Sequence, residues 1–147
     1  MEPAIVKVKK LDPRAILPAR GSADAAGADL YALLEEDVTL LPGETAMIPT
    51  GLSMEIPSGY AGLIFARSGL ASKKGLAPAN KVGVVDSDYR GEFLVALHNH
   101  SAVSHTVSCG DRIAQLVIVP YLPAVFEEAE SLSDTDRGTG GFGSTGK

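Results

Sequence analysis

The sequence contains no tryptophan and only one cysteine, Cys109. A single cysteine cannot form a disulfide within its own chain, so nothing indicates a crosslinked, secreted fold. The residues after Met1 lack the apolar run of a signal peptide, and we expect a cytoplasmic protein. No apolar run approaches the roughly 18 residues that a membrane helix needs, so we expect no membrane partner.

Basic residues are in the minority. The chain has 13 Lys and Arg against 18 Asp and Glu, which gives a formal net charge of −5 at pH 7. Proteins that bind a long phosphate backbone normally present a basic surface. The charge balance therefore argues against a nucleic acid polymer as partner, but it allows a small anion held by a few local cations.

Helical signals and aromatic side chains are also scarce. Aromatic residues make up 5% of the 147 residues, and glycine and proline recur along the chain. Only residues 68–74 favour a helix, of about two turns at most. We predict strands at residues 5–8, 38–40, 45–48, 60–65, 82–85, 93–97, 106–108 and 113–119. This spacing predicts a single antiparallel domain: a sandwich, a barrel or a jelly roll.

Residues 137–147 contain five glycines and one aromatic residue, Phe142. Such a segment cannot fold alone, and a disordered tail is the plain interpretation. However, an arginine, hydroxyl side chains and one phenylalanine are also suited to surrounding a phosphate and covering a base. A tail that becomes ordered over a ligand fits both interpretations.

The segment Asp86-Ser-Asp88-Tyr89 places two carboxylates on one side of an extended backbone. A calcium loop is disfavoured, because its twelfth position would be Leu97 and not a glutamate. The alternatives left are a hairpin with solvated acids, and a carboxylate that positions and deprotonates water beside a flat aromatic face.

Two further segments allow a structural and a functional interpretation. Arg67, Ser68 and Gly69 stand at the N-terminus of the predicted helix, as an anion site or as a surface arginine with a serine N-cap. Strand alternation after Gly110 places Asp111 and Arg112 within the core, where an ion pair is as reasonable as a ligand contact. The segment around Asp29 is a turn leading into a strand and indicates little alone.

Together, and in this order, these five segments resemble the five motifs of the trimeric dUTPase family. The likeness runs from Lys7 to the last residue, and its most specific parts are Gly83-Val-Val-Asp-Ser-Asp-Tyr-Arg-Gly91, Gly110-Asp-Arg-Ile-Ala-Gln115 and Arg137-Gly-Thr-Gly-Gly-Phe-Gly-Ser144. The resemblance implies a jelly-roll or distorted-barrel subunit over residues 1–136, and a flexible tail, 137–147, that closes over the site. It also implies a homotrimer with active sites shared between subunits.

The same resemblance implies hydrolysis of dUTP to dUMP and pyrophosphate, which limits uracil incorporation into DNA and supplies dUMP for thymidylate synthesis. Asp86 would activate the water that attacks the α-phosphorus. Tyr89 would pack against the deoxyribose where a 2′-hydroxyl cannot fit. Asn80 and the hairpin backbone, including Val85, would contact the uracil edge.

The remaining implied roles concern the phosphates and the metal. Arg67, Ser68 and Gly69 would hold phosphate oxygens, with Gln115 beside the triphosphate or its ordered water. Asp29 would bind Mg²⁺ through water. Arg137, Ser144 and Thr145 would hold the γ-phosphate, Phe142 would cover the uracil, and Gly143 would complete the tail contacts.

Two positions depart from the family pattern: Ala66 stands where proline is frequent, and Lys74 where histidine is common. Neither removes a catalytic group. His98 and His100 share a strand face, but no third ligand is evident, so solvated histidines are favoured over zinc. Cys109 is expected to be a small core or turn residue.

Two rival functions remain. One is a dCTP deaminase of the same fold, which the segment Asp86–Tyr89 disfavours. The other is a nucleotide-binding regulatory trimer without catalysis, which the presence of Asp86, Arg137 and Phe142 disfavours.

Overall fold

The computed structural model describes residues 1–144, and within them twelve strands and one short helix are formed. The helix η1 (Leu70–Lys74) is a single π-helical turn that ends at Gly75, whose φ of +66° is left-handed and suits glycine. The strands are β1 (Lys7–Lys10), β2 (Ala19–Arg20), β3 (Ala28–Tyr31), β4 (Val38–Leu40), β5 (Thr45–Pro49), β6 (Leu52–Glu55), β7 (Tyr60–Phe65), β8 (Leu76–Pro78), β9 (Gly83–Val85), β10 (Leu94–Asn99), β11 (His105–Val107) and β12 (Arg112–Pro120). The prediction of an all-β subunit with one short helix is confirmed.

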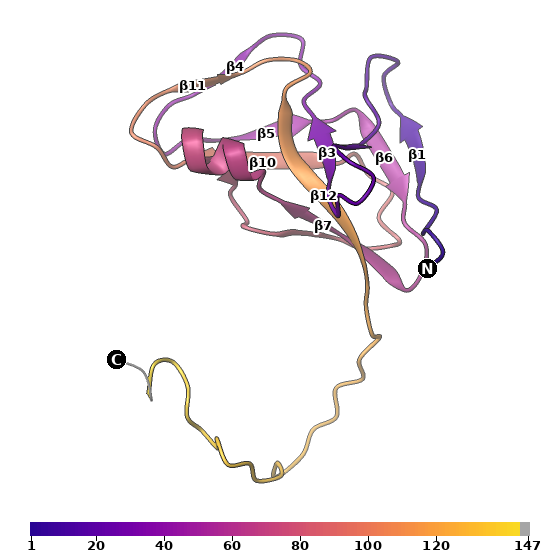
Figure 1. Ribbon diagram of the computed structural model, residues 1–147, viewed down its shortest axis with the longest axis vertical. Helices are drawn as coiled ribbons and strands as arrows, with labels where there is room; N and C mark the ends of the chain where they lie inside the picture. The colour runs from indigo at the N-terminus through magenta and orange to yellow at the C-terminus, as the bar shows by residue number, and fades with distance from the viewer. Residues whose placement is uncertain (145–147) are drawn as a thin grey trace.

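The strands form a jelly roll of small antiparallel sheets (Figure 1). The largest sheet has the order β2-β3-β12-β7-β9, and β5-β10-β8 forms a second one. Two pairs, β1-β6 and β11-β4, complete the described strands, and no sheet closes on itself as a barrel within residues 1–144. The long strand β12 lies between β3 and β7, so it joins segments that are far apart in sequence.

The core is aliphatic, as the low aromatic content requires. Leu30, Ile48, Leu52 and Leu97 are fully buried, and they come from β3, β5, β6 and β10. Phe93 is the only aromatic side chain in this core among the described residues. Branched aliphatic side chains pack well between pleated sheets, so the fold needs few large rings.

Several details differ from the sequence prediction. The short strands β2, β6 and β8 were not predicted. The expectation that Asp111 and Arg112 lie in the core is wrong, because both residues are exposed. The register of β12 against β3 shifts between Arg112 and Ala114, which leaves Ile113 and Ala114 both buried. Such a bulge interrupts the alternation on which the expectation depended.

After Pro120 the chain leaves the body as an extended arm (Figure 1). Its apolar side chains are almost fully exposed: Leu122 by 90%, Val125 by 92% and Phe126 by 95%. Isolated apolar side chains are common on surfaces, but an arm with no contacts of its own cannot hold them in place. No helix in residues 1–144 is long and apolar enough to cross a membrane.

Candidate active site

The hairpin after β8 forms one wall of a cavity of about 310 Å³. Asn80, Val85, Asp86 and Tyr89 all line it, together with Phe93, which directly precedes β10. Pairing between β7 and β9 positions the hairpin, since Val85 lies opposite Gly62 and Gly83 opposite Ile64. The structure therefore brings the four expected residues of this segment to one cavity. We call this group the hairpin pocket.

Tyr89 is held inside the hairpin pocket by its own loop. Its hydroxyl donates to the carbonyl oxygen of Glu92 at 2.8 Å, and its ring centroid is 6.1 Å from that of Phe93. Asp86, by contrast, has an exposed side chain and forms no ion pair within the described residues. The pocket thus combines a held aromatic ring with a carboxylate that water can reach.

A second group of expected residues gathers where β3, β12 and β7 lie side by side. Gln115 of β12 is paired with Asp29 of β3 on one side and with Phe65 of β7 on the other. Arg67 follows β7 directly, so its guanidinium reaches the same place. We call Asp29, Arg67, Gln115 and their neighbours the phosphate cluster, after the role expected for it.

The polar side chains of the phosphate cluster hold one another. Arg67 Nε donates to Asp29 Oδ1 at 2.7 Å, and Arg112 Nη1 lies 3.9 Å from Asp29 Oδ2. The amide nitrogen of Gln115 donates to the carbonyl oxygen of Ala66 at 2.8 Å. Asp29 is only 17% exposed, so its charge needs these cationic partners.

Ser68 and Gly69 are exposed at the start of η1, beside a second cavity of about 500 Å³. Arg67, Lys73, Lys74 and Arg112 line this cavity together with one acid, Asp111, so its charged side chains are mostly basic. The side chain of Ser68 does not cap the helix, whereas its carbonyl accepts from Ser72 Oγ at 2.6 Å. The serine N-cap interpretation therefore has no support in the structure.

The tail residues lie apart from both groups, at the end of the arm (Figure 1). They form local turns: Arg137 Nε donates to the carbonyl of Gly140 at 2.7 Å, and the Gly141 amide donates to Ser144 Oγ at 2.8 Å. The side chain of Phe142 is fully exposed, and Gly143 adopts a left-handed φ of +81°. Thr145 lies outside the described residues.

One chain therefore holds the expected site in three separate places. Asp86 follows β9 at the end of the sheet where β7 begins, whereas Arg67 follows the other end of β7. The four residue steps from Ala61, the next position in the β9 register, to Phe65 alone span about 13 Å of extended strand. Asp86 and the phosphate cluster thus lie toward opposite ends of the same strand.

Two glycines matter in ways that the sequence interpretation missed. A Cβ on Gly27 would lie 2.2 Å from Gln115 Oε1, so only glycine leaves room for this amide. A Cβ on Gly91 would lie 2.4 Å from the Tyr89 hydroxyl oxygen. Gly91 stands inside a quoted motif and Gly27 in the segment around Asp29, but only the folded contacts reveal why glycine is needed there.

The fit of a divalent cation can be judged from the donor set. No three His, Cys, Asp or Glu side chains gather in residues 1–144, so the protein provides no closed metal cage. Mg²⁺ commonly binds through one carboxylate, water and substrate phosphates. Asp29 supplies one such carboxylate, and its Oδ2 has only the distant contact with Arg112. The residues therefore fit a hydrated ion that also needs substrate oxygens.

The comparisons with known proteins agree with this arrangement. Residues 13–146 match the family model of dUTPase. The deoxyuridine 5'-triphosphate nucleotidohydrolase of Desulfitobacterium hafniense is 51% identical, over 96% of this chain and 97% of its own. That of Syntrophotalea carbinolica is 48% identical over 99% of each chain. A solved structure, the G164S mutant of the Staphylococcus bacteriophage 80alpha dUTPase with dUpNHpp, has a TM-score of 0.89. It is 31% identical and covers 97% of this chain and 99% of its own.

The jelly roll and the names of its relatives place the chain among the enzymes that hydrolyse nucleotides. The family model and both named relatives point to the same family within this class. The chain belongs to the dUTPase family.

Proposed function

We propose that this protein hydrolyses dUTP to dUMP and pyrophosphate in the hairpin pocket. The chain is a dUTP diphosphatase by family membership, and its relatives are named for that reaction. The observation that carries the proposal is the cavity that places Asn80, Asp86 and Tyr89 around one space. Such a space offers an amide for a base, a ring for a sugar and a carboxylate for water.

The hairpin pocket selects the base and the sugar. Asn80 and the backbone around Val85 face uracil, whose O4 accepts and whose N3–H donates, the reverse of the pattern in cytosine. The ring of Tyr89 lies against the deoxyribose and leaves no room for a 2′-hydroxyl. The neighbours with bound dUpNHpp support a uracil nucleotide as ligand of this fold.

Asp86 provides the general base. Its exposed carboxylate holds a water molecule in line with the α-phosphorus and accepts its proton during attack. The new bond forms between the water oxygen and the α-phosphorus, while the bond to the oxygen that bridges to the β-phosphorus breaks. Arg67, Ser68, Gly69 and Gln115 hold the phosphate oxygens, so catalysis consists mainly of positioning and charge stabilisation.

Asp29 is proposed to hold Mg²⁺ through water. When bound, the ion supplies positive charge against the phosphate oxygens of the substrate and of the leaving pyrophosphate. Arg67 and Arg112, which contact Asp29, keep its carboxylate oriented toward this place. Mg²⁺ is the ion that the resemblance to the family implies, and the oxygen donors are compatible with it.

We further propose that the site is completed in a homotrimer. Within one chain, Gly83 pairs with Ile64 near the end of β7, and Val85 pairs with Gly62 near its beginning. Asn80, which precedes Gly83, therefore lies toward the end of β7 that leads to Arg67. Asp86, which follows Val85, lies toward the opposite end. A nucleotide with its base at Asn80 and its α-phosphate at Asp86 therefore extends its phosphates away from the Arg67 of the same chain. A second copy must supply the phosphate cluster.

The arm supports a third contribution. Residues 121–144 leave the body with Leu122, Val125 and Phe126 exposed, and these side chains can be buried against another copy. The tail then covers the nucleotide, with Arg137 and Ser144 at the γ-phosphate, Phe142 over uracil and Gly143 between them. Thr145, outside the described residues, belongs to the same clamp. We place this enzyme in the cytoplasm, where it acts on the nucleotide pool.

Pyrophosphate release from dUTP, compared with UTP, dCTP and dTTP, tests the proposal. We expect turnover of dUTP alone at low micromolar enzyme, and its loss on removal of divalent cations. Ammonia release from dCTP would show the deaminase instead. Tight nucleotide binding without pyrophosphate release would show the regulatory alternative.

A further inference from the structure

We propose that Glu92 positions Tyr89 for sugar selection by tying the hairpin to the buried turn at Gly51; this inference rests on the sugar-reading role proposed above for Tyr89. Glu92 lines the hairpin pocket but belongs to none of the expected contacts with dUTP. It joins the pocket to the core by two separate hydrogen bonds, one through its backbone and one through its side chain.

The backbone tie holds the ring. The Tyr89 hydroxyl donates to the Glu92 carbonyl oxygen at 2.8 Å, which turns the side chain back over its own loop. Gly91 makes this turn feasible, because a Cβ there would lie 2.4 Å from the hydroxyl oxygen and 2.6 Å from Cζ. The position of the ring therefore depends on where the carbonyl of Glu92 stands.

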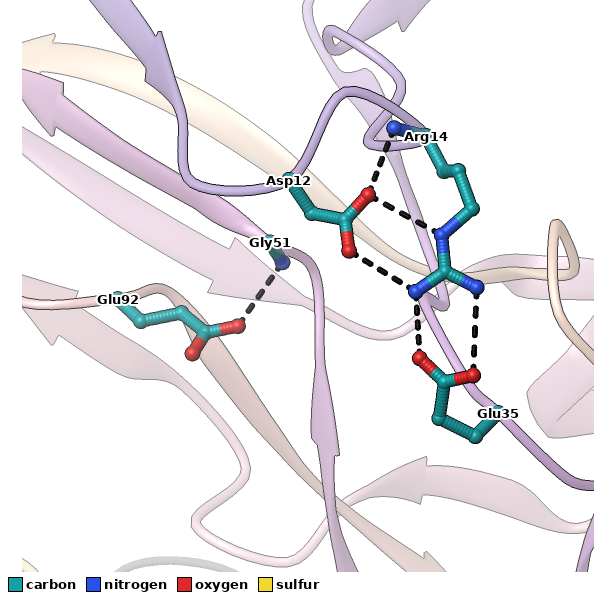
Figure 2. A network of polar contacts seen from close by, with 5 residues as sticks. All are labelled: Asp12, Arg14, Glu35, Gly51 and Glu92. Atoms are coloured by element: carbon teal, nitrogen blue, oxygen red, sulfur yellow. Dashed lines mark hydrogen bonds and ion pairs between the residues drawn. The ribbon is translucent and has the colours of Figure 1, made fainter.

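The side-chain tie holds the turn on which the peptide with that carbonyl is anchored. Glu92 Oε2 accepts from the Gly51 amide at 2.9 Å, a contact drawn in Figure 2. Gly51 is buried at a left-handed φ of +70°, and a Cβ on it would lie 2.4 Å from Leu33 Cδ2. A buried amide needs a partner, and at this turn the carboxylate of Glu92 supplies it.

The same turn anchors the peptide group that carries the Glu92 carbonyl. Its neighbour Leu52 accepts from the Phe93 amide at 2.8 Å, and Thr50 Oγ1 donates to the Phe93 carbonyl at 2.7 Å. On the other side, the Leu11 amide donates to the Gly51 carbonyl at 2.8 Å. Next to Leu11, Asp12 is bound by Arg14, which also contacts Glu35 (Figure 2).

Loss of the carboxylate leaves the buried Gly51 amide without its partner and loosens the turn. The Glu92 carbonyl shares a planar peptide group with the Phe93 amide, which is held by Leu52 of this turn, so the acceptor of the Tyr89 hydroxyl shifts with the turn. The ring then adopts more positions, and some of them admit a 2′-hydroxyl. The expected result is a protein that still folds and still attacks dUTP but discriminates poorly against UTP.

The test compares kcat/KM for dUTP and for UTP in Glu92→Leu and Glu92→Gln. We expect the preference for dUTP to fall by about 10- to 100-fold in Glu92→Leu, since a small misplacement has effects of this size. Glu92→Gln keeps an oxygen acceptor for the Gly51 amide and should stay near the wild-type ratio. The fall should come mainly from a gain in UTP turnover.

Glu44 offers a matched control. Its Oε2 accepts from the Leu41 amide at 2.8 Å in a turn outside the hairpin pocket. Glu44→Leu removes the same kind of contact and should leave the dUTP to UTP ratio unchanged. Equal falls in Glu92→Leu and Glu44→Leu would contradict a specific positioning role.

Gly91→Ala gives a second variant with no effect on Gly51. The new Cβ displaces the flexible end of Tyr89, so the ratio should fall while the fold remains. Amide exchange measured by NMR should be faster at Gly51 in Glu92→Leu and unchanged in Gly91→Ala. An unchanged ratio in Glu92→Leu would overturn the inference, whether or not the ratio falls in Gly91→Ala. A wild-type enzyme without preference for dUTP over UTP would overturn both the role of Tyr89 and this inference.

Discussion

The hairpin pocket and the phosphate cluster are built by different physical means. The pocket is lined by strand residues and by the loop after β9, and in this loop the carboxylate proposed as the base, Asp86, stays exposed. The cluster consists of neighbours on three paired strands, and its carboxylate, Asp29, is 17% exposed and bound to Arg67. The acid proposed to exchange protons with water is accessible, whereas the acid proposed to hold the metal ion is held by cations.

The two groups also differ in what they can recognise. The pocket presents an aromatic ring, an amide and backbone groups, which suit a base and a sugar. The cluster and its basic neighbours Lys73 and Lys74 suit phosphate oxygens. Changes in one group should therefore alter a property that changes in the other leave intact.

The largest effect is expected for Asp86→Asn. The amide cannot accept the proton of the attacking water, so turnover should fall by on the order of 10²–10⁴, while dUTP binding is kept. Single-turnover pyrophosphate release and calorimetric binding of dUpNHpp measure the two properties. Near-normal turnover would remove Asp86 from the mechanism.

Gly27→Ala should have the next largest effect, in the phosphate cluster. The added Cβ pushes the amide of Gln115 away from its position beside Asp29 and Arg67. We expect kcat/KM for dUTP to fall by about 10- to 100-fold with an unchanged dUTP to UTP ratio. A changed ratio would mean that the two groups do not act separately.

Tyr89→Ala should change the dUTP to UTP ratio, which Gly27→Ala leaves unchanged. Removal of the ring opens space beside the sugar, so the preference for dUTP over UTP should narrow by about tenfold or more. Competition assays with both nucleotides in one reaction measure this ratio directly. If the ratio does not move, the sugar is recognised elsewhere.

The smallest effect concerns a site away from both groups. The hydrogen bond from Arg14 lowers the pKa of Asp12 from 3.8 to about 2, and Arg14 also lowers the pKa of Glu35. A carboxyl group whose pKa is lowered in the folded protein stabilises the fold when the pH is above its ordinary, unfolded pKa. This contribution is lost as the pH falls through the pKa of the folded state. Asp12→Asn should therefore lower Tm slightly at pH 7, and the difference from wild type should vanish between pH 4 and pH 2. A constant difference would contradict the ion pair.

Much of the fold can be predicted from the sequence, because short β-rich runs between glycines and prolines leave few alternatives. Val38–Leu40 and Tyr60–Phe65 form strands with the predicted bounds. Leu76–Pro78 and Leu52–Glu55 were missed because each is short, directly follows a glycine and has a proline at or close after its end, with no alternation to detect. Long-range pairing, not local preference, makes them strands.

The candidate site, like the fold, could be predicted from the sequence only in part. Motifs predicted which residue types belong to it, and the structure groups most of them. The pairing of Asp29 with Arg67 could not be predicted, because these residues are 38 positions apart and meet only through β12. The need for Gly27 and Gly91 is also invisible in sequence, since it depends on the side chains of Gln115 and Tyr89.

The central claim is that one active site needs parts from different subunits, and a mixing experiment tests it most directly. Asp86→Asn with an intact tail and a chain truncated after Asp136 should each be nearly inactive as homotrimers. The two are unfolded together, refolded at equal ratio and checked for trimers by size-exclusion chromatography. A working site then needs its hairpin from the truncated chain and its tail from the Asp86→Asn chain. Random assembly makes these independent choices of one half each, so about a quarter of the sites should recover pyrophosphate release. Activity that stays at the level of the separate variants, in mixed trimers, would show that hairpin and tail come from the same subunit.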